Sequence, residues 1–157
     1  MIKVKIVEFL ENKLKNELQA IADIAENSKK EATHSDMKPE SKYDTRAIEA
    51  SYLAGAQAKR VFEIIRDLDE LQSLEIEKTH EQASIGSVLT LDYNNFESHY
   101  FISPTTGGFF VQIENKSYMI LGINSPIAQA SIGLQAGESF EVETPKEIRE
   151  YTITGLA

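Results

Sequence analysis

The stretch AIEASYLAGAQAKRVFEIIRDLDEL, residues 47–71, carries small or apolar side chains at a seven-residue spacing. One seam consists of Ala47, Ala54, Val61 and Leu68, and a second seam of Ala50, Ile64 and Leu71 is interrupted by the polar Gln57. Two seams sustained over about three and a half heptads are typical of a helix packed along another helix. The stretch therefore predicts one long helix of a coiled coil.

The partner helix is predicted immediately upstream. Apolar residues recur at helical spacing from Val7 through Ile24. Between the two runs lies THSDMKPESKYD, residues 33–44, which is almost free of apolar side chains and carries Asp36, Glu40 and Asp44. Residues 1–76 are thus expected to form an antiparallel coiled-coil hairpin with an acidic tip at 33–44.

Downstream of the hairpin the period changes from helical to alternating. After a polar linker, six short alternating segments are separated by glycine and proline signals. They are residues 87–93, 100–102, 109–113, 118–121, 139–143 and 150–154. Residues 77–157 are expected to form a small, mainly antiparallel sheet domain, which makes the fold class α+β. The aromatic residues Tyr93, Phe96, Phe101, Phe109, Phe110 and Tyr118 are assigned to its core.

A short helix is expected within this domain, over residues 125–133. Ser125 suits the N-cap, Pro126 the first turn and Gly133 the C-terminal stop. Its apolar residues Ile127, Ala130 and Ile132 are expected to pack on the sheet.

Composition limits the classes of function. The formal net charge is −9, and residues 79–157 contain only 3 lysine and arginine residues against 9 acidic ones, so tight nucleic-acid binding by that half is not expected. The absence of cysteine excludes disulfides and thiolate metal sites. No run approaches the length of a membrane span, and no signal peptide opens the chain, so a cytoplasmic protein without a membrane partner is expected.

The segments NSPIAQASIGLQAGESFEVETP, residues 124–145, and REYTI, residues 149–153, carry a family resemblance. They resemble the C-terminal domain of the Gre-type (GreA/GreB) transcript cleavage factors of bacterial RNA polymerase. That family combines an N-terminal antiparallel coiled coil with a globular domain of FKBP-like fold, so the resemblance covers nearly the whole chain in architecture.

The resemblance implies a function for the acidic tip. Gre-type factors bind RNA polymerase with the globular domain and insert the coiled coil into the secondary channel. There the tip carboxylates share a Mg²⁺ ion with the polymerase, which then cleaves its own backtracked RNA. The chain would therefore bind no cofactor by itself, have no active site of its own, act as a monomer and touch nascent RNA only indirectly.

Site residues follow from aligning Tyr43 with the tyrosine of the family's tip motif. This alignment places Asp36 on the first acid and Pro39 on the second, with Glu40 one position later. Asp36 and Glu40 are the candidate catalytic and metal-binding residues acting in trans. Lys38, Lys42 and Tyr43 are candidates for contact with the polymerase channel.

The docking surface is expected on the globular domain. The resemblance favours Ser125, Pro126 and Gln129 as the residues that contact the polymerase. Three alternatives remain open at this point: a channel binder that modulates transcription without cleavage because Pro39 replaces an acid, an FKBP-like prolyl isomerase, and an adaptor without a channel role. Asp36 and Glu40 could also have purely structural roles, Asp36 as a turn residue and Glu40 as an acid in the first turn of a helix.

Overall fold

The computed structural model describes the backbone of residues 1–32 and 41–157, and the side chains of residues 1–24, 26–27 and 55–157. Contacts divide the chain into two compact units. Residues Leu10–Asp69 form what we call the helix unit, and Met1–Phe9 together with Glu70–Ala157 form the sheet unit.

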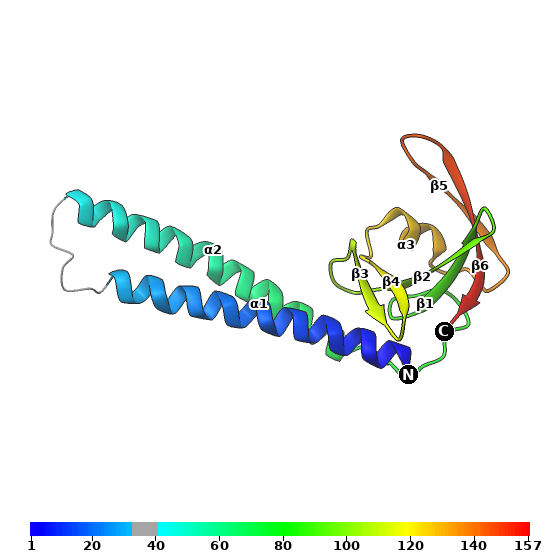
Figure 1. Ribbon diagram of the computed structural model, residues 1–157, viewed down its shortest axis with the longest axis horizontal. Coiled ribbons are helices and arrows are strands. Elements are labelled where there is room, and N and C mark those ends of the chain that lie inside the picture. The colour runs from blue at the N-terminus through cyan, green and yellow to red at the C-terminus, as the bar shows by residue number, and fades with distance from the viewer. Residues whose placement is uncertain (33–40) are drawn as a thin grey trace. The chain divides into compact units, whose positions relative to one another are not determined.

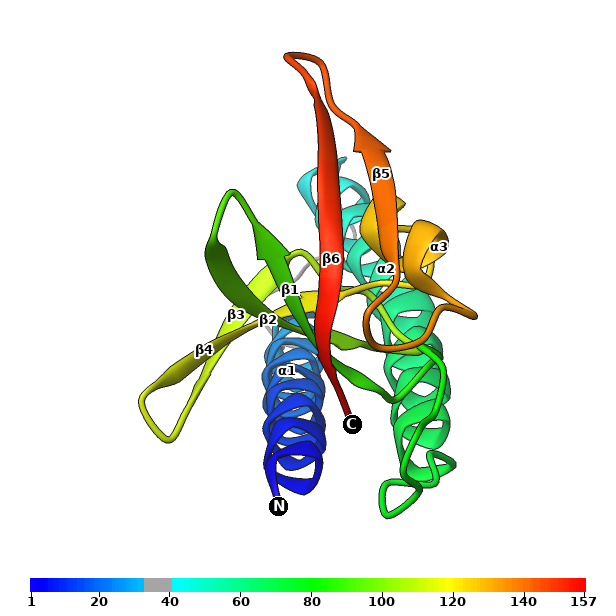
Figure 2. The same ribbon diagram turned by 90° about the vertical axis from the view of Figure 1, so that its right-hand side faces the viewer.

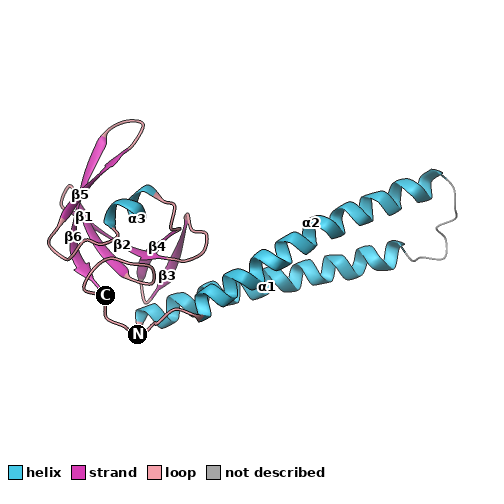
Figure 3. Ribbon diagram, turned by 180° about the vertical axis from the view of Figure 1, so that it is seen from behind, coloured by secondary structure: helices cyan, strands magenta, loops and turns pink. Residues whose placement is uncertain are grey.

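The helix unit contains most of two long helices, α1 (Ile2–Ala32) and α2 (Ser41–Gln72). They lie side by side and run in opposite directions (Figures 1 and 3). Leu10 of α1 and Ile64 of α2 are buried, whereas the neighbouring Ile65 is 52% exposed. Both helices lie where the apolar spacing predicts them, and Ile64 confirms that the second seam faces inward.

An ion pair joins the two helices near the middle of α1. Arg60 donates from Nε to Glu17 Oε1 at 2.6 Å and from a terminal nitrogen to Glu17 Oε2 at 2.8 Å. The hydrogen bond from Arg60 holds the pKa of Glu17 below its usual value. Because both side chains are partly exposed, such a pair stabilises by about 1 kcal/mol at most, but its two parallel bonds fix how the helices align.

Gln57 lies one turn before Arg60 and interrupts the seam, as the sequence indicates. Its Oε1 is buried and accepts no hydrogen bond from the residues that the structure describes. A buried acceptor without a donor costs about 1–3 kcal/mol. The helix unit therefore carries one unfavourable group inside an otherwise apolar contact.

The sheet unit holds six strands in the order β3-β4-β2-β1-β6-β5. Their bounds are β1 Val88–Tyr93, β2 Phe96–Ile102, β3 Phe109–Ile113, β4 Lys116–Leu121, β5 Ser139–Glu143 and β6 Ile148–Leu156. All six expected strands are present. However, the sheet is mixed, because β2 and β4 pair in parallel while the other neighbours are antiparallel. The expected mainly antiparallel sheet is therefore confirmed, with one parallel pair that was not foreseen. This pair arises because β3 reverses the chain and β4 reverses it again, so β4 returns beside β2 in the same direction.

Two tight hairpins set the strand ends. Asn94 and Asn95 join β1 to β2, and Glu114 and Asn115 join β3 to β4, with φ between 48° and 66° at all four residues. Two successive residues with positive φ are typical of the two-residue turns that match the twist of a hairpin. The turn at Asn94 explains why β2 begins at Phe96, earlier than its alternation indicates.

The two faces of the sheet are covered differently. The short helix α3 (Pro126–Ser131) lies beside β5 and packs its Ala128 into a cluster that includes Leu91 and Ile153 (Figure 2). Within the same unit, the first turns of α1 meet the opposite face, where Val7 and Phe101 line one cavity and Lys5 forms an ion pair with Glu114. No helix in the described part of the chain has an apolar run long enough to cross a bilayer.

We expect Ile64→Ala to destabilise the helix unit by about 2–5 kcal/mol, because it removes a fully buried side chain and leaves a cavity. The matched control is Ile65→Ala at the next, half-exposed position, which should cost well under half as much. Urea unfolding followed by circular dichroism at 222 nm measures both free energies. Equal losses would contradict the assignment of Ile64 to the seam.

Candidate functional site

The sheet unit brings Ser125, Pro126 and Gln129 together at the start of α3. Ser125 is the N-cap residue, with extended backbone, and its Oγ accepts a hydrogen bond from the backbone N–H of Ala128 at 3.1 Å. Pro126 occupies the first turn, where it forfeits no helical hydrogen bond. Pro126 and Gln129 are exposed. Two of the three expected docking residues therefore face solvent, and the third has a structural hydrogen bond.

Backbone hydrogen bonds anchor α3 at its far end. The N–H of Gly133 donates to the carbonyl of Ala83, and the N–H of Ala83 donates to the carbonyl of Leu134, both at 2.8 Å. Gly133 has a φ of +89°, which a residue with a side chain rarely adopts. Ala83, at the end of the linker, is buried in the core cluster. These bonds tie the linker to α3 and hold the helix in a fixed place on the sheet.

The expected helix core needs one correction. Ile127 and Ala130 pack against the core cluster as predicted, and Ala128 is fully buried between them. Ile132 is 44% exposed. It is the C-cap residue, with non-helical backbone, so helical spacing no longer directs its side chain to the sheet.

Beside α3 the sheet bears an open cavity of about 560 Å³, which we call the aromatic groove. Its apolar lining comes from Phe96, Tyr100, Phe110, Met119, Ile127 and Tyr151. Phe96 and Phe110 are 72% and 68% exposed, so assigning them to the core was wrong. Phe109 and Phe110 are adjacent in β3 and must point to opposite faces, which is the sequence signal that could have placed Phe110 outside.

Electrostatics at the groove are simple. Burial raises the pKa of Tyr100, so its phenol stays neutral at physiological pH. Arg149 is the basic residue in the lining, and its guanidinium lies 5.1 Å from the ring centroid of Tyr93. Its Nε also donates to Glu147 at 3.2 Å. The lining also contains one carboxylate, that of Glu97, so the formal charges of Arg149 and Glu97 balance. The groove is thus mainly apolar with no net charge, a surface suited to another protein rather than to nucleic acid.

The predicted tip residues Asp36, Lys38 and Glu40 lie outside the described residues. Lys42 and Tyr43 lie in the first turn of α2, in the part of that helix whose side chains are not described. Among the described residues, no group of three or more histidine, aspartate or glutamate side chains is placed to hold a metal ion. The structure therefore places the docking candidates and leaves the tip candidates as predictions.

The fold is α+β, with a pair of long helices and a sheet unit that bears an exposed aromatic groove. Two relatives match most or nearly all of this chain. It is 27% identical to the transcription elongation factor GreA of Nitrosococcus oceani, with 99% of this chain and 98% of that protein covered. It is 28% identical to the GreA of Neisseria meningitidis serogroup B, with 89% and 88% covered. These relatives confirm the resemblance to the Gre-type transcription elongation factors.

A solved structure of GreA factor homolog 1 from Thermus thermophilus aligns with 98% of this chain and 93% of its own, at 18% identity and a TM-score of 0.39. No protein-family model matches the chain.

We expect Ser125→Ala to lower the free energy of unfolding of the sheet unit by about 1 kcal/mol, because it removes the acceptor that caps α3. Ser125→Asp should retain most of the stability, since aspartate caps equally well. Thermal unfolding followed by near-ultraviolet circular dichroism measures the difference. If both variants lose the same stability, capping is not the role of this side chain.

Proposed function

We propose that this chain is a transcription elongation factor that binds bacterial RNA polymerase and stimulates the polymerase's own cleavage of backtracked RNA. Residues 1–76 would serve as the coiled-coil hairpin that enters the secondary channel. Residues 77–157 would form the FKBP-like domain that docks at its rim. The chain would act in the cytoplasm, as a monomer and without catalytic activity of its own.

One observation carries the proposal. Two antiparallel helices of 31 and 32 residues are joined by only eight residues, and those eight include Asp36 and Glu40. A helix of this length extends about 46 Å, far more than a hairpin needs to hold its own loop. Two long helices joined by a short acidic segment could carry the carboxylates of that segment into a deep cavity.

The chemistry of the donor set supports a role at a metal. Carboxylate oxygens are the ligands that Mg²⁺ prefers, and an ion held between polymerase and factor would activate the attacking water and stabilise the leaving oxygen. Asp36 would hold that ion. The family has a second acid at the position of Pro39, and Glu40, the next residue of this chain, would take the place of that acid. Lys38, Lys42 and Tyr43 would contact the walls of the channel.

The docking half of the proposal rests on the exposed end of α3 and on the aromatic groove. Pro126 and Gln129 lie at that end, and Ile127 of the same helix lines the groove. Exposed aromatic side chains around an apolar cavity are typical of the centre of a protein interface. A helix or loop of the polymerase with an apolar side chain at its centre would fill the groove.

We expect the wild-type chain to shorten 3′-labelled RNA in stalled, backtracked polymerase complexes, and Asp36→Asn to slow this cleavage by about tenfold or more. Even groups that only support a metal ligand change activity by about 10- to 100-fold, and a direct ligand should matter at least as much. Glu40→Gln should show a smaller loss. Asp44→Asn, an acid further along the same segment, is the matched control and should retain the activity.

Two results of that experiment would redirect the proposal. Binding to the polymerase without any released fragments would favour the channel binder that modulates transcription without cleavage, as Pro39 at the second acidic position allows. Absence of binding would reject both versions.

We expect Phe110→Ala to weaken binding to RNA polymerase by about tenfold, since truncation of an aromatic anchor at an interface centre typically costs that much or more. Ile148→Ala is the control, because Ile148 is 65% exposed and does not line the groove. Fluorescence anisotropy of labelled factor measures both dissociation constants. Prolyl isomerase activity that depends on Phe110 would instead favour the isomerase alternative.

A further inference from the structure

The linker between α2 and β1 borders a second open cavity within the sheet unit, of about 530 Å³, which we call the linker pocket. It shares no lining residue with the aromatic groove. Its apolar wall is formed by Val7, Leu74, Ile76, Ile85, Phe101 and Ile132. A cavity of this size with a mainly apolar wall and a few polar groups is typical of a small-molecule site.

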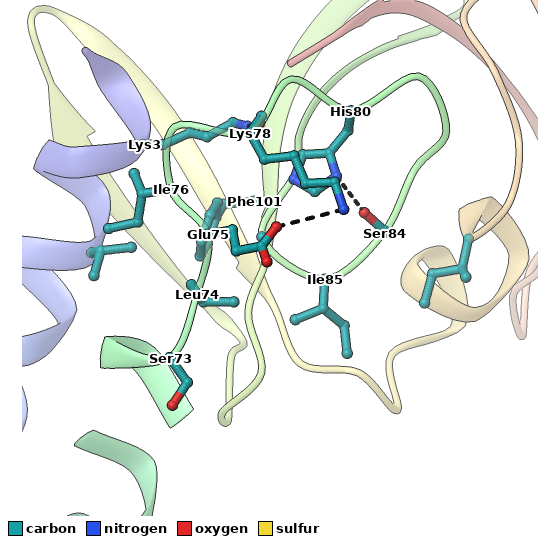
Figure 4. Close-up of a pocket in the computed structure, with 13 residues that line it drawn as sticks. Lys3, Ser73, Leu74, Glu75, Ile76, Lys78, His80, Ser84, Ile85 and Phe101 are labelled. Atoms are coloured by element: carbon teal, nitrogen blue, oxygen red, sulfur yellow. Dashed lines mark hydrogen bonds and ion pairs between the residues drawn. The ribbon is translucent and has the colours of Figure 1, made fainter. Parts of the chain in front are cut away.

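The polar side of the pocket is a short row of side chains from the linker. His80 and Ser84 share a hydrogen bond of 2.7 Å between Nδ1 and Oγ, and Lys78 Nζ lies 3.6 Å from Glu75 Oε2 (Figure 4). In Figure 4 the side chain of Lys78 reaches between Glu75 and His80. The ammonium of Lys78 is therefore at the pocket, with only a long contact to its carboxylate neighbour.

Lys3 provides a second cation at the same pocket. It is only 7% exposed, and its Nζ donates to the backbone carbonyl of Lys78 at 2.7 Å. An ammonium group has three donors, and this bond uses one of them. Burial lowers the pKa of Lys3, because it disfavours the charged ammonium. An anionic oxygen in the pocket would give this ammonium a second acceptor beside the carbonyl of Lys78.

The net charge of the lining favours a single negative charge. Lys3 and Lys78 carry two positive charges, and Glu75 carries one negative charge. The pKa of His80 is lowered by burial first and then by Lys3 and Lys78, so its imidazole is neutral at physiological pH. The pocket thus has an excess of one positive charge in a chain whose formal charge is −9. A phosphate dianion would bring more charge than these groups neutralise.

We propose that the linker pocket binds a small amphipathic carboxylate. Its apolar body lies against Leu74, Ile85 and Ile132, and its carboxylate accepts hydrogen bonds from Lys78 and Lys3. This site is separate from the proposed polymerase-docking surface, and its occupancy does not require that proposal to hold.

The test is an NMR titration of the full chain at neutral pH with three ligands that share one body: 4-phenylbutyrate, 4-phenylbutan-1-ol and 4-phenylbutylamine. We expect amide shifts at the linker pocket and an affinity for the carboxylate about tenfold higher than for the alcohol, since charge-assisted hydrogen bonds account for such a ratio. The amine should bind more weakly than the alcohol.

Variants identify the cation responsible. Lys78→Met should abolish the preference for the carboxylate, and Lys78→Arg should restore most of it. The fold should survive, because the Lys78 side chain is 61% exposed and the bond from Lys3 goes to its backbone. Lys146→Met, which removes an exposed lysine outside the pocket, is the matched control and should retain the preference.

His80 gives an independent readout, because a bound anion beside it stabilises the imidazolium and raises its pKa. The ring NMR signals of His99, which bonds Thr90 and lies outside the lining of the linker pocket, should not change when the ligand is added. Equal affinity for the carboxylate and the alcohol, shifts confined to the aromatic groove, or no shifts at millimolar ligand would each overturn the proposal.

Discussion

The apolar seam between α1 and α2 is the contact on which the helix unit depends. Single helices are marginal in water, and most helical stability in proteins comes from packing one face against a partner. Here Leu10 and Ile64 supply buried faces, and the two bonds from Arg60 to Glu17 fix the alignment of the helices. Gln57 sets a limit on this packing, because its buried oxygen has no donor among the described residues. A polar residue within an apolar seam lowers the stability of a helix pair but favours one register of the two helices over others.

The sheet unit separates two kinds of surface on its two faces. The face that carries α3 exposes aromatic side chains, Phe96 and Phe110 among them, which suits an interface with a protein. The opposite face is covered by the linker and the first turns of α1. It carries the linker pocket, in which polar side chains lie beside an apolar wall. The lysines of the second surface come from segments outside the strands, which explains why the acidic sheet sequence alone gives no hint of a cationic pocket.

Much of the fold could be predicted because local signals were strong. Helical spacing of apolar residues located α1, and heptad spacing located α2. Alternation located the six strands, and Ser125, Pro126 and Gly133 located α3. The parallel pairing of β2 and β4 could not be read from alternation, which specifies a face and not a neighbour. Of the candidate site, the place of Ser125, Pro126 and Gln129 at α3 followed from the sequence, and their contact with a partner stays a prediction. The aromatic groove could not be predicted, because it depends on which strands lie side by side. The linker pocket was missed because Lys3, Phe101 and His80 are far apart in sequence and each is unremarkable alone.

Strand β6 occupies an interior place in the sheet, between β1 and β5. Among the described strands, β5 has no other neighbour, and β1 relies on β6 along one of its edges. During synthesis, the sheet therefore stays incomplete until residue 156 has emerged from the ribosome. The helix unit, made of residues 10–69, emerges much earlier and can form from contacts among its own residues. Nascent chains of this protein would thus pass through a stage in which the helices are paired while β1 to β4 still await their last partner.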